Sequence, residues 1–168
     1  MKIYTRKGDD GTTGLLYGGR VGKDSLEIDV NGTIDEAQAA LGLARAETEP
    51  GHDLDELLVR LERELYVLMA EVATAPANRS KLTPGTSLVT SAMVSDLEAE
   101  IDRLTDRFDM PTEFVVPGGT RTAAALDVAR TIVRRAERLA VGLELHSESR
   151  VLPYINRLSD LLWTMARW

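Results

Sequence analysis

Apolar residues recur every three or four positions over long stretches of the chain, separated by shorter stretches without any period. This spacing places apolar side chains on one face of an α-helix and predicts amphipathic helices. No stretch of strand-like alternation stands between them, so the pattern predicts an all-α fold, a bundle of five helices. The predicted helices cover residues 29–48, 54–74, 91–107, 121–145 and 151–167.

The stretches without a period predict loops. Residues 1–25 contain six glycines and are expected to form an N-terminal loop ahead of a helical bundle in residues 26–168. Residues 75–87 and 108–120 carry Pro and Gly between helical segments, and the first of these is expected to be a mobile loop. A chain of 168 residues is then a single domain, which buries about 70% of its unfolded surface.

The fourth predicted helix has two contrasting faces. The face opposite its apolar stripe carries Arg130, Arg134, Glu137 and Arg138, with Arg135 at the margin. A solvated outer face is the simplest interpretation of such a group. The apolar stripe, which we expect to face the core, consists of Ala125, Val128, Ala129, Ile132, Ala136, Leu139 and Leu143.

The local charge favours an anionic ligand instead. Between residues 120 and 138, five arginines stand against Asp127 and Glu137, a local charge of +3 in a chain of net charge −7. Guanidinium groups bind phosphate oxygens through paired donors. Thr120 precedes these residues and is predicted to cap the helix.

Two other helices also carry a second face. In the fifth helix, Leu158, Leu161, Leu162 and Met165 form the core stripe, and the opposite face consists of Asn156, Asp160, Trp163 and Arg167. In the first helix, Asp35 shares its face with the small residues Ala39, Gly42 and Ala46. Small residues permit close approach of another element, and a tryptophan outside the core indicates a partner or ligand. These faces predict an oligomer, in which a buried Asp35 would need an arginine partner.

The glycine-rich start of the chain leaves two interpretations open. "KGDDGTTG" has the composition of a phosphate-binding loop, but it lacks the Gly-Lys-Ser/Thr ending of a P-loop and a helix directly after it. A surface turn explains the glycines equally well. The surrounding basic and hydroxyl side chains make phosphate binding as plausible as the turn.

Composition excludes several classes of function. The chain has no cysteine, two histidines, 5% aromatic residues and a pI near 4.9. These values argue against thiol chemistry, a catalytic triad, a di-iron centre and nucleic-acid binding. No apolar run is long enough for a signal peptide or a membrane span, so we expect a cytoplasmic protein without a membrane partner. With no evident nucleophile or base of its own, an enzyme of this sequence would use a reactive atom supplied by a substrate or cofactor.

Five stretches together resemble the PduO-type ATP:cob(I)alamin adenosyltransferases, also called corrinoid adenosyltransferases. They are "YTRKGDDGTTGLLYGGRVGKD", "GTIDEAQAALG", "FVVPGGT", "ALDVARTIVRRAER" and "YINRLSDLLWTMAR", in order and at suitable distances over nearly the whole chain. Residues 48–113 match only as amphipathic helices.

The resemblance implies a five-helix bundle, ferritin-like or cobalamin adenosyltransferase-like in fold, assembled as a homotrimer with active sites between subunits. It implies transfer of the 5′-deoxyadenosyl group of ATP to the cobalt of cob(I)alamin, giving adenosylcobalamin and tripolyphosphate. Magnesium accompanies the ATP. A reductase that supplies reduced cobalamin and an adenosylcobalamin-dependent enzyme are the implied partners.

The resemblance also implies roles for matched residues. Arg134 would hold the polyphosphate, Asn156 would contact the nucleotide, and Arg135, Glu137 and Arg138 belong to the same nucleotide-binding segment. Lys23 would contact a phosphate, and Glu137 is a possible magnesium ligand. The loop that wraps ATP would consist of Thr5, Arg6, Lys7, Gly8, Asp9, Gly11, Thr12 and Thr13.

The resemblance implies roles for three further residues, two of them next to the site and one toward cobalamin. Asp35 and Arg130 would form a salt bridge between subunits, and Phe114 would displace the lower axial ligand of cobalamin. Two other functions remain as alternatives: a non-catalytic carrier of corrinoid or nucleotide with the same bundle, and a purely structural helical trimer.

Overall fold

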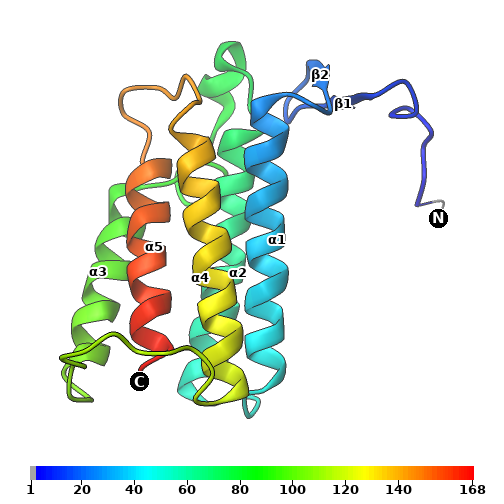
Figure 1. Ribbon diagram of the computed structural model, residues 1–168. Coiled ribbons are helices and arrows are strands. Elements are labelled where there is room, and N and C mark those ends of the chain that lie inside the picture. The colour runs from blue at the N-terminus through cyan, green and yellow to red at the C-terminus, as the bar shows by residue number, and fades with distance from the viewer. Residues whose placement is uncertain (1–2) are drawn as a thin grey trace.

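The computed structural model describes residues 3–168 and has five long helices, one short 3-10 helix and a two-stranded hairpin (Figure 1). The strands β1 (Thr12–Gly14) and β2 (Arg20–Gly22) pair antiparallel, with Thr13 opposite Val21. The other elements are α1 (Leu26–Ala46), α2 (Asp53–Val72), η1 (Pro76–Lys81), α3 (Ser91–Thr105), α4 (Arg121–Ala140) and α5 (Val151–Met165).

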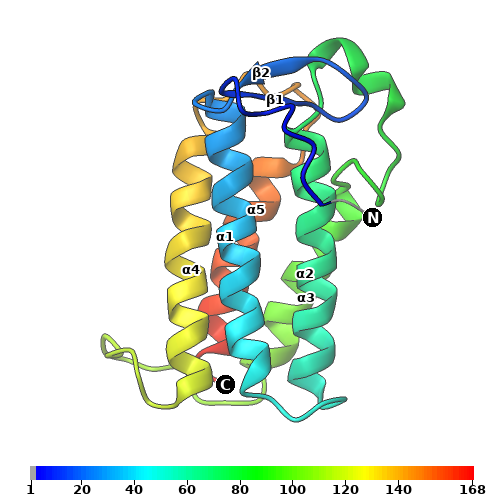
Figure 2. The same cartoon turned by 90° about the vertical axis from the view of Figure 1, so that its right-hand side faces the viewer.

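The long helices run roughly parallel to one axis and pack in the order α2, α1, α4, α5, α3 around the bundle (Figures 1 and 2). The hairpin, η1 and residues 141–150 gather at one end, which we call the upper end. Residues 106–120, between α3 and α4, lie at the opposite or lower end, together with the C-terminus. None of the helices in residues 3–168 is both long and apolar enough to span a membrane.

Helix starts follow the capping residues in the sequence. The hydroxyl of Thr120 accepts a hydrogen bond from the backbone N–H of Ala123 at 3.0 Å, which confirms it as the N-cap of α4. Thr90 caps α3 in the same way through Met93. The core consists of interlocking aliphatic side chains from all five long helices, among them the fully buried Ile34, Leu58, Leu97, Leu126 and Leu158, and the aromatic Tyr154.

Two predicted loops contain regular structure. The prediction of an N-terminal loop without strands was wrong, because Thr12–Gly14 and Arg20–Gly22 form a hairpin around a turn in which Tyr17, Gly18 and Gly19 have positive φ angles. Residues 76–81, expected to lie in a loop, form η1. Strands of three residues are too short for a periodic pattern to reveal them.

The core face of α4 also differs from the prediction. Leu126, Asp127, Ala129, Val133, Ala136 and Ala140 are its buried residues, whereas Val128 is 52% exposed and Ile132 and Leu139 are only partly buried. The helix ends at Ala140, five residues earlier than predicted and just before Gly142. On α5 the predicted core residues are buried, but Arg167 beyond its end, placed on the outer face by the pattern, is buried too.

Candidate active site

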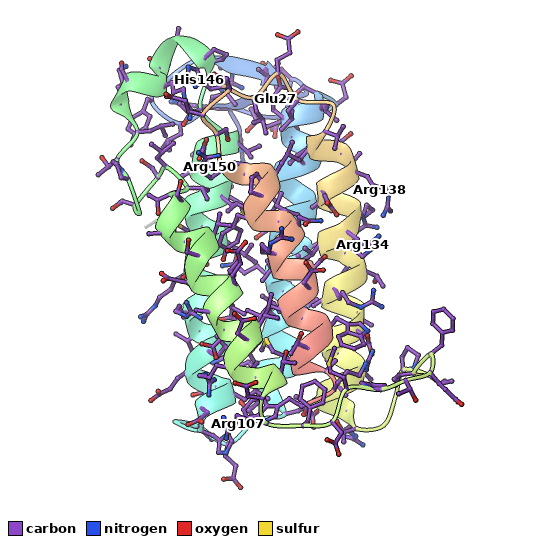
Figure 3. All side chains as sticks on the ribbon, turned by 90° about the vertical axis from the view of Figure 1, so that its left-hand side faces the viewer. Glu27, Arg107, Arg134, Arg138, His146 and Arg150 are labelled. Carbon is purple, nitrogen blue, oxygen red and sulfur yellow. The ribbon has the colours of Figure 1, made fainter. Side chains whose placement is uncertain are left out.

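The outward face of α4 presents guanidinium groups. Figure 3 shows Arg134 and Arg138 projecting from α4 away from the neighbouring helices. Both are exposed, and within residues 3–168 neither forms an ion pair with a carboxylate. Arg138 donates to the backbone oxygen of Arg134 at 3.0 Å, one turn away. Arg135 points elsewhere, into an ion pair with Glu36 on α1. Two of the three adjacent arginines are thus available to an anion.

A fixed amide lies beside these arginines. Asn156 on α5 donates from Nδ2 to Oε1 of Glu137 at 2.8 Å, and its Oδ1 accepts from Nη1 of Arg157 at 2.7 Å. Two partners on opposite sides of the amide fix its orientation. The structure therefore joins α5 to α4 through Asn156 and Glu137, on the helix that also presents the exposed Arg134 and Arg138.

A buried ion pair joins α4 to the residues that follow α5, closer to the lower end. Asp127 is 4% exposed, and its two carboxylate oxygens accept from both terminal nitrogens of Arg167 at 2.9–3.0 Å. Arg130 adds a third donor through Nε at 3.1 Å. A buried carboxylate with a two-pronged guanidinium partner resists separation, because removing either group leaves a buried charge. The hydrophobic pattern of the sequence did not reveal this pair, because it placed Arg167 on the outer face of the fifth helix.

The predicted bridge between Asp35 and Arg130 is not formed inside one chain. Arg130 pairs with Asp127 on its own helix, and Asp35 is exposed on α1. Asp35, Ala39 and Ala46 all lie on the exposed side of that helix, as predicted. A contact between the two residues would require a second copy of the chain, so the bridge stays a prediction.

The N-terminal loop is organised by hydrogen bonds of its own. Arg20, which the sequence did not single out, donates to Thr12 Oγ1 from Nε at 3.0 Å and to the backbone oxygen of Lys7 from Nη2 at 2.6 Å. Asp10 accepts from the N–H and the hydroxyl of Thr12. These hydrogen bonds, chiefly that from the Thr12 hydroxyl, lower the pKa of Asp10.

The side chain of Lys23 lies close to Gly8 in this loop. A Cβ at Gly8 would lie 3.1 Å from both Lys23 Nζ and the backbone oxygen of Thr12, so a larger residue would require these neighbours to shift by a few tenths of an ångström. The other predicted loop residues, Thr5, Arg6, Asp9, Gly11 and Thr13, lie in the same segment, with Arg6 and Gly11 at positive φ. An ammonium group, hydroxyl groups and backbone turns gather here, as a phosphate site requires.

The loop and the arginines are apart in the single chain. The segment before β1 leaves the bundle on the side of α1 and α2, whereas the arginines project from α4 (Figures 1 and 3). Within the described residues 3–168, no hydrogen bond or ion pair joins residues 5–23 to Arg134, Arg138 or Asn156. The two groups of predicted site residues, each a candidate half-site, thus face different directions in one chain.

Phe114 stands alone at the lower end. Its side chain is completely exposed, in the segment between α3 and α4, and Val116 beside it is 85% exposed. Beneath this segment lies a cavity of 860 Å³, a size suited to a ligand, with an apolar lining that includes Phe108, Val115, Leu126, Met165 and Trp168. An exposed aromatic next to an apolar cavity of this size indicates that a large ligand or a partner covers it. Both histidines, His52 and His146, are exposed, as predicted.

The profile of a family described as "Cobalamin adenosyltransferase" matches residues 3–168. The chain belongs to the cobalamin adenosyltransferase family. Among curated members, the corrinoid adenosyltransferase of Bacillus subtilis is 42% identical over 99% of this chain and 86% of its own length. The corrinoid adenosyltransferase PduO of Salmonella typhimurium is 40% identical over 99% of this chain, which spans 49% of that protein.

Solved structures of the cobalamin adenosyltransferase family share the fold. A phenylalanine-to-alanine variant of the PduO-type ATP:corrinoid adenosyltransferase from Lactobacillus reuteri, complexed with cobalamin and ATP, superposes with a TM-score of 0.86 at 31% identity. The alignment covers 99% of this chain and 92% of that one. An arginine-to-lysine variant of the same enzyme complexed with ATP has a TM-score of 0.84 at 29% identity, covering 98% of this chain and 92% of that one.

Proposed function

We propose that this protein transfers the 5′-deoxyadenosyl group of ATP to the cobalt of cob(I)alamin, giving adenosylcobalamin and tripolyphosphate. The observation that carries this conclusion is the match of the whole chain to the adenosyltransferase family, at about 40% identity to corrinoid adenosyltransferases. The arginines that face solvent on α4 beside a fixed asparagine supply the chemistry that an ATP site needs.

The active site is formed between subunits of a homotrimer. The two half-sites of one chain point in different directions, so the loop of one subunit would meet the arginine face of the next. Apolar side chains exposed on the helices support an assembled state: Leu43 on α1 is 66% exposed, Tyr66 on α2 62% and Val128 on α4 52%. In the trimer, Asp35 of one subunit would reach Arg130 of its neighbour, whose Nη atoms are not used by Asp127.

ATP is held by contributions from both half-sites. Arg134, assisted by Arg138, binds the polyphosphate, and Asn156 contacts the nucleotide from α5. Lys23 and the turn around Gly8, Thr12 and Thr13 wrap the phosphates from the other subunit. Arg135 acts indirectly, because its pairing with Glu36 fixes α4 against α1.

Magnesium is expected to enter with the triphosphate. Mg²⁺ usually keeps several waters and binds through one or two carboxylates together with substrate phosphates. Glu137 fits this role, because it lies between Arg134 and Arg138 in the sequence of α4 and is already oriented by Asn156. When bound, the ion would neutralise part of the phosphate charge.

The reaction needs no nucleophile from the protein. Cobalt(I) attacks the C5′ carbon of ATP, the C5′–O bond breaks, and the electron pair leaves on the tripolyphosphate. The arginines stabilise the charge that develops on this leaving group, and losing one such preorganised donor raises a barrier by roughly 3–4 kcal/mol. Phe114 would act on the other substrate, by displacing the lower axial ligand so that cob(II)alamin is more easily reduced. A reductase supplies that electron, and an adenosylcobalamin-dependent enzyme uses the product.

A spectrophotometric assay tests this function. The protein is mixed with chemically reduced cobalamin, ATP and magnesium, and conversion to adenosylcobalamin is followed by its absorbance. Conversion that depends on both the protein and ATP is the expected result. Binding of both substrates without conversion would instead support the non-catalytic carrier.

A further inference from the structure

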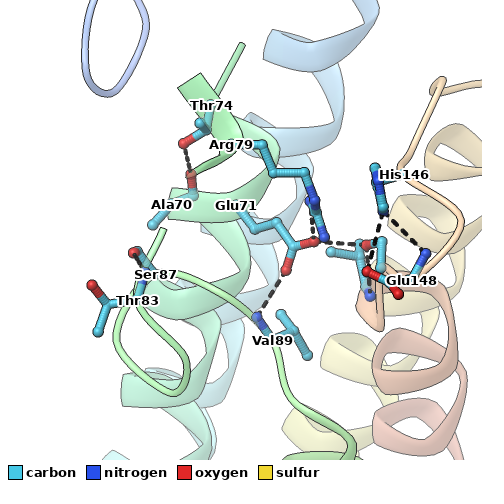
Figure 4. Close-up of polar contacts among 11 residues, drawn as sticks. Ala70, Glu71, Thr74, Arg79, Thr83, Ser87, Val89, His146 and Glu148 are labelled. Atoms are coloured by element: carbon cyan, nitrogen blue, oxygen red, sulfur yellow. Dashed lines mark hydrogen bonds and ion pairs between the residues drawn. The ribbon is translucent and has the colours of Figure 1, made fainter. Parts of the chain in front are cut away.

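The last turn of α2 carries a buried carboxylate that the proposed site does not use. Glu71 is 4% exposed, and its Oε1 accepts from Arg79 Nη1 at 3.0 Å and from Ser149 Oγ at 2.7 Å (Figure 4). Its Oε2 accepts from the backbone N–H of Val89 at 2.8 Å. Burial and the C-terminal end of a helix both disfavour a negative charge. Three charge-assisted hydrogen bonds to three separate segments offset that cost.

One of these segments carries the N-terminal hairpin. Arg79 belongs to η1, and its neighbour Asn78 donates to the backbone oxygen of Gly18 in the hairpin turn at 3.3 Å. The hairpin is also bonded directly to the end of α2, because the N–H of Leu16 donates to the backbone oxygen of Ala73 at 2.8 Å. The ATP-wrapping half-site is thus hydrogen-bonded to the C-terminal end of α2, where Glu71 forms its own hydrogen bonds.

A second segment begins α5. The hydroxyl of Ser149 donates to Glu71 and accepts from the N–H of Val151, the first residue of that helix, at 3.3 Å. Asn156 lies on α5 less than two turns further along. Because a helix transmits displacement of its first turn along its length, the position of Ser149 helps to set the position of Asn156.

We propose that Glu71 is a positioning residue for ATP, which fixes the hairpin half-site and the Asn156 half-site of each subunit at a set separation. The inference rests on the proposed function. Since the two half-sites of one subunit serve two different active sites in the trimer, Glu71 ties neighbouring nucleotide sites to one another. It acts through Arg79 and Ser149 and does not touch substrate.

Variants of the partners test this role, because changing Glu71 itself risks misfolding. Ser149→Ala removes the link to α5, Arg79→Met removes the link to η1, and Ser149→Thr keeps the hydroxyl. Loss of one charge-assisted hydrogen bond should raise the KM for ATP about tenfold in each of the first two variants, with kcat changed less. Ser149→Thr should restore a value close to wild type. The KM for cobalamin should not change, because Phe114 belongs to the segment between α3 and α4 at the lower end, whereas Glu71 lies in the last turn of α2 at the upper end.

The matched control is Ile101→Val, which removes one methyl group from α3 and lowers stability without touching the network. Kd for MgATP, measured by calorimetry, separates binding from turnover. Unchanged KM and Kd for ATP in Ser149→Ala and Arg79→Met, at a lowered Tm, would show that Glu71 only stabilises the fold. Failure of the proposed function is a different result, since the wild-type protein would then make no adenosylcobalamin.

Discussion

The two ends of the bundle are built in opposite ways. At the upper end, the hairpin, η1 and residues 141–150 are joined to the helices by backbone hydrogen bonds and by the buried Glu71. At the lower end, residues 108–119 form no hydrogen bond with any part of the described chain, and Phe114 is fully exposed above a large apolar cavity.

This difference matches the two substrates of the proposed reaction. A triphosphate is bound by directional donors, which work best when their positions are fixed in advance. A corrin ring is large and mostly apolar, and a segment without hydrogen bonds can adapt to it as it is covered. Within the described residues, the hairpin of the proposed nucleotide half-site is therefore held by directional hydrogen bonds, whereas residues 108–119, which carry Phe114, form none.

The largest effect is expected at the nucleotide side. Arg134→Ala should lower kcat by about 100- to 1,000-fold, because a preorganised donor to the leaving triphosphate is lost. Its Tm and oligomeric state should stay at the wild-type values, since Arg134 is exposed and makes no ion pair within residues 3–168. The rate of adenosylcobalamin formation measures the first expectation and sedimentation the second. Arg103→Ala, on α3, is the control, and wild-type turnover in Arg134→Ala would contradict the assignment.

At the cobalamin end, Phe114→Ala should separate the two substrates. We expect loss of about nine-tenths of the activity with cob(II)alamin and a reductant, a factor that corresponds to about 1.4 kcal/mol. The Kd for ATP and the Tm should not change, because the side chain is fully exposed. Val116→Ala, in the same segment, controls for loss of exposed apolar surface. An unchanged rate would remove Phe114 from the mechanism.

Asp35→Asn tests whether α1 of one subunit meets α4 of its neighbour across a subunit interface. The variant keeps the shape of the side chain but weakens its pairing with Arg130 of a neighbour, and we expect turnover or trimer stability to fall about tenfold, the loss of a charge-assisted hydrogen bond. Sedimentation at decreasing protein concentration measures the assembly. Glu27→Gln, on the first turn of α1, is the control. If neither assembly nor rate responds, the assignment of a bridge is mistaken.

The smallest effect concerns the middle of the bundle. Burial raises the pKa of Glu64 above its ordinary 4.5, and the hydroxyl of Tyr154 only partly opposes this. Above pH 4.5 and up to the raised value, the folded state holds a proton that the unfolded chain has released, so stability falls as pH rises through that window.

Glu64→Gln removes this titration. At pH 7 the Tm of the variant should exceed that of wild type by at most about 2 °C. At pH 4 the difference between the two Tm values should be smaller. Thermal unfolding followed by circular dichroism at both pH values measures it, with Glu56→Gln on the same helix as the exposed control. Parallel Tm profiles for wild type and Glu64→Gln would show that Glu64 titrates alike in both states.

Sequence reasoning succeeded where an apolar period decides the structure. The five long helices, the Thr120 cap and the core of α5 all follow from spacing and capping. It failed on the face of α4, because that helix is rich in alanine and its orientation is set by the buried pair of Asp127 and Arg167, which a hydrophobic pattern counts as exposed. The hairpin was missed because its pairing depends on Arg20 and on positive φ angles.

Some residues of the candidate site were likewise identified from the sequence, and others were not. Arg134, Glu137, Arg138 and Asn156 were identified from helical spacing and family motifs, and the fold joins Asn156 to α4 by a hydrogen bond to Glu137. Glu71 and Arg20 escaped notice, since each acts through partners far away in the sequence and belongs to no motif. The hydrophobic pattern along a sequence does not indicate which single polar residues will pair when they lie far apart in the chain.

Polar clamps join α4 and α5 at two levels: Asp127 holds Arg167 near the lower end, and Glu137 holds Asn156 further up. Two helices fastened at two heights cannot slide or roll past each other without breaking both clamps. A displacement of α5 along α4 must therefore either break these contacts or carry both helices together.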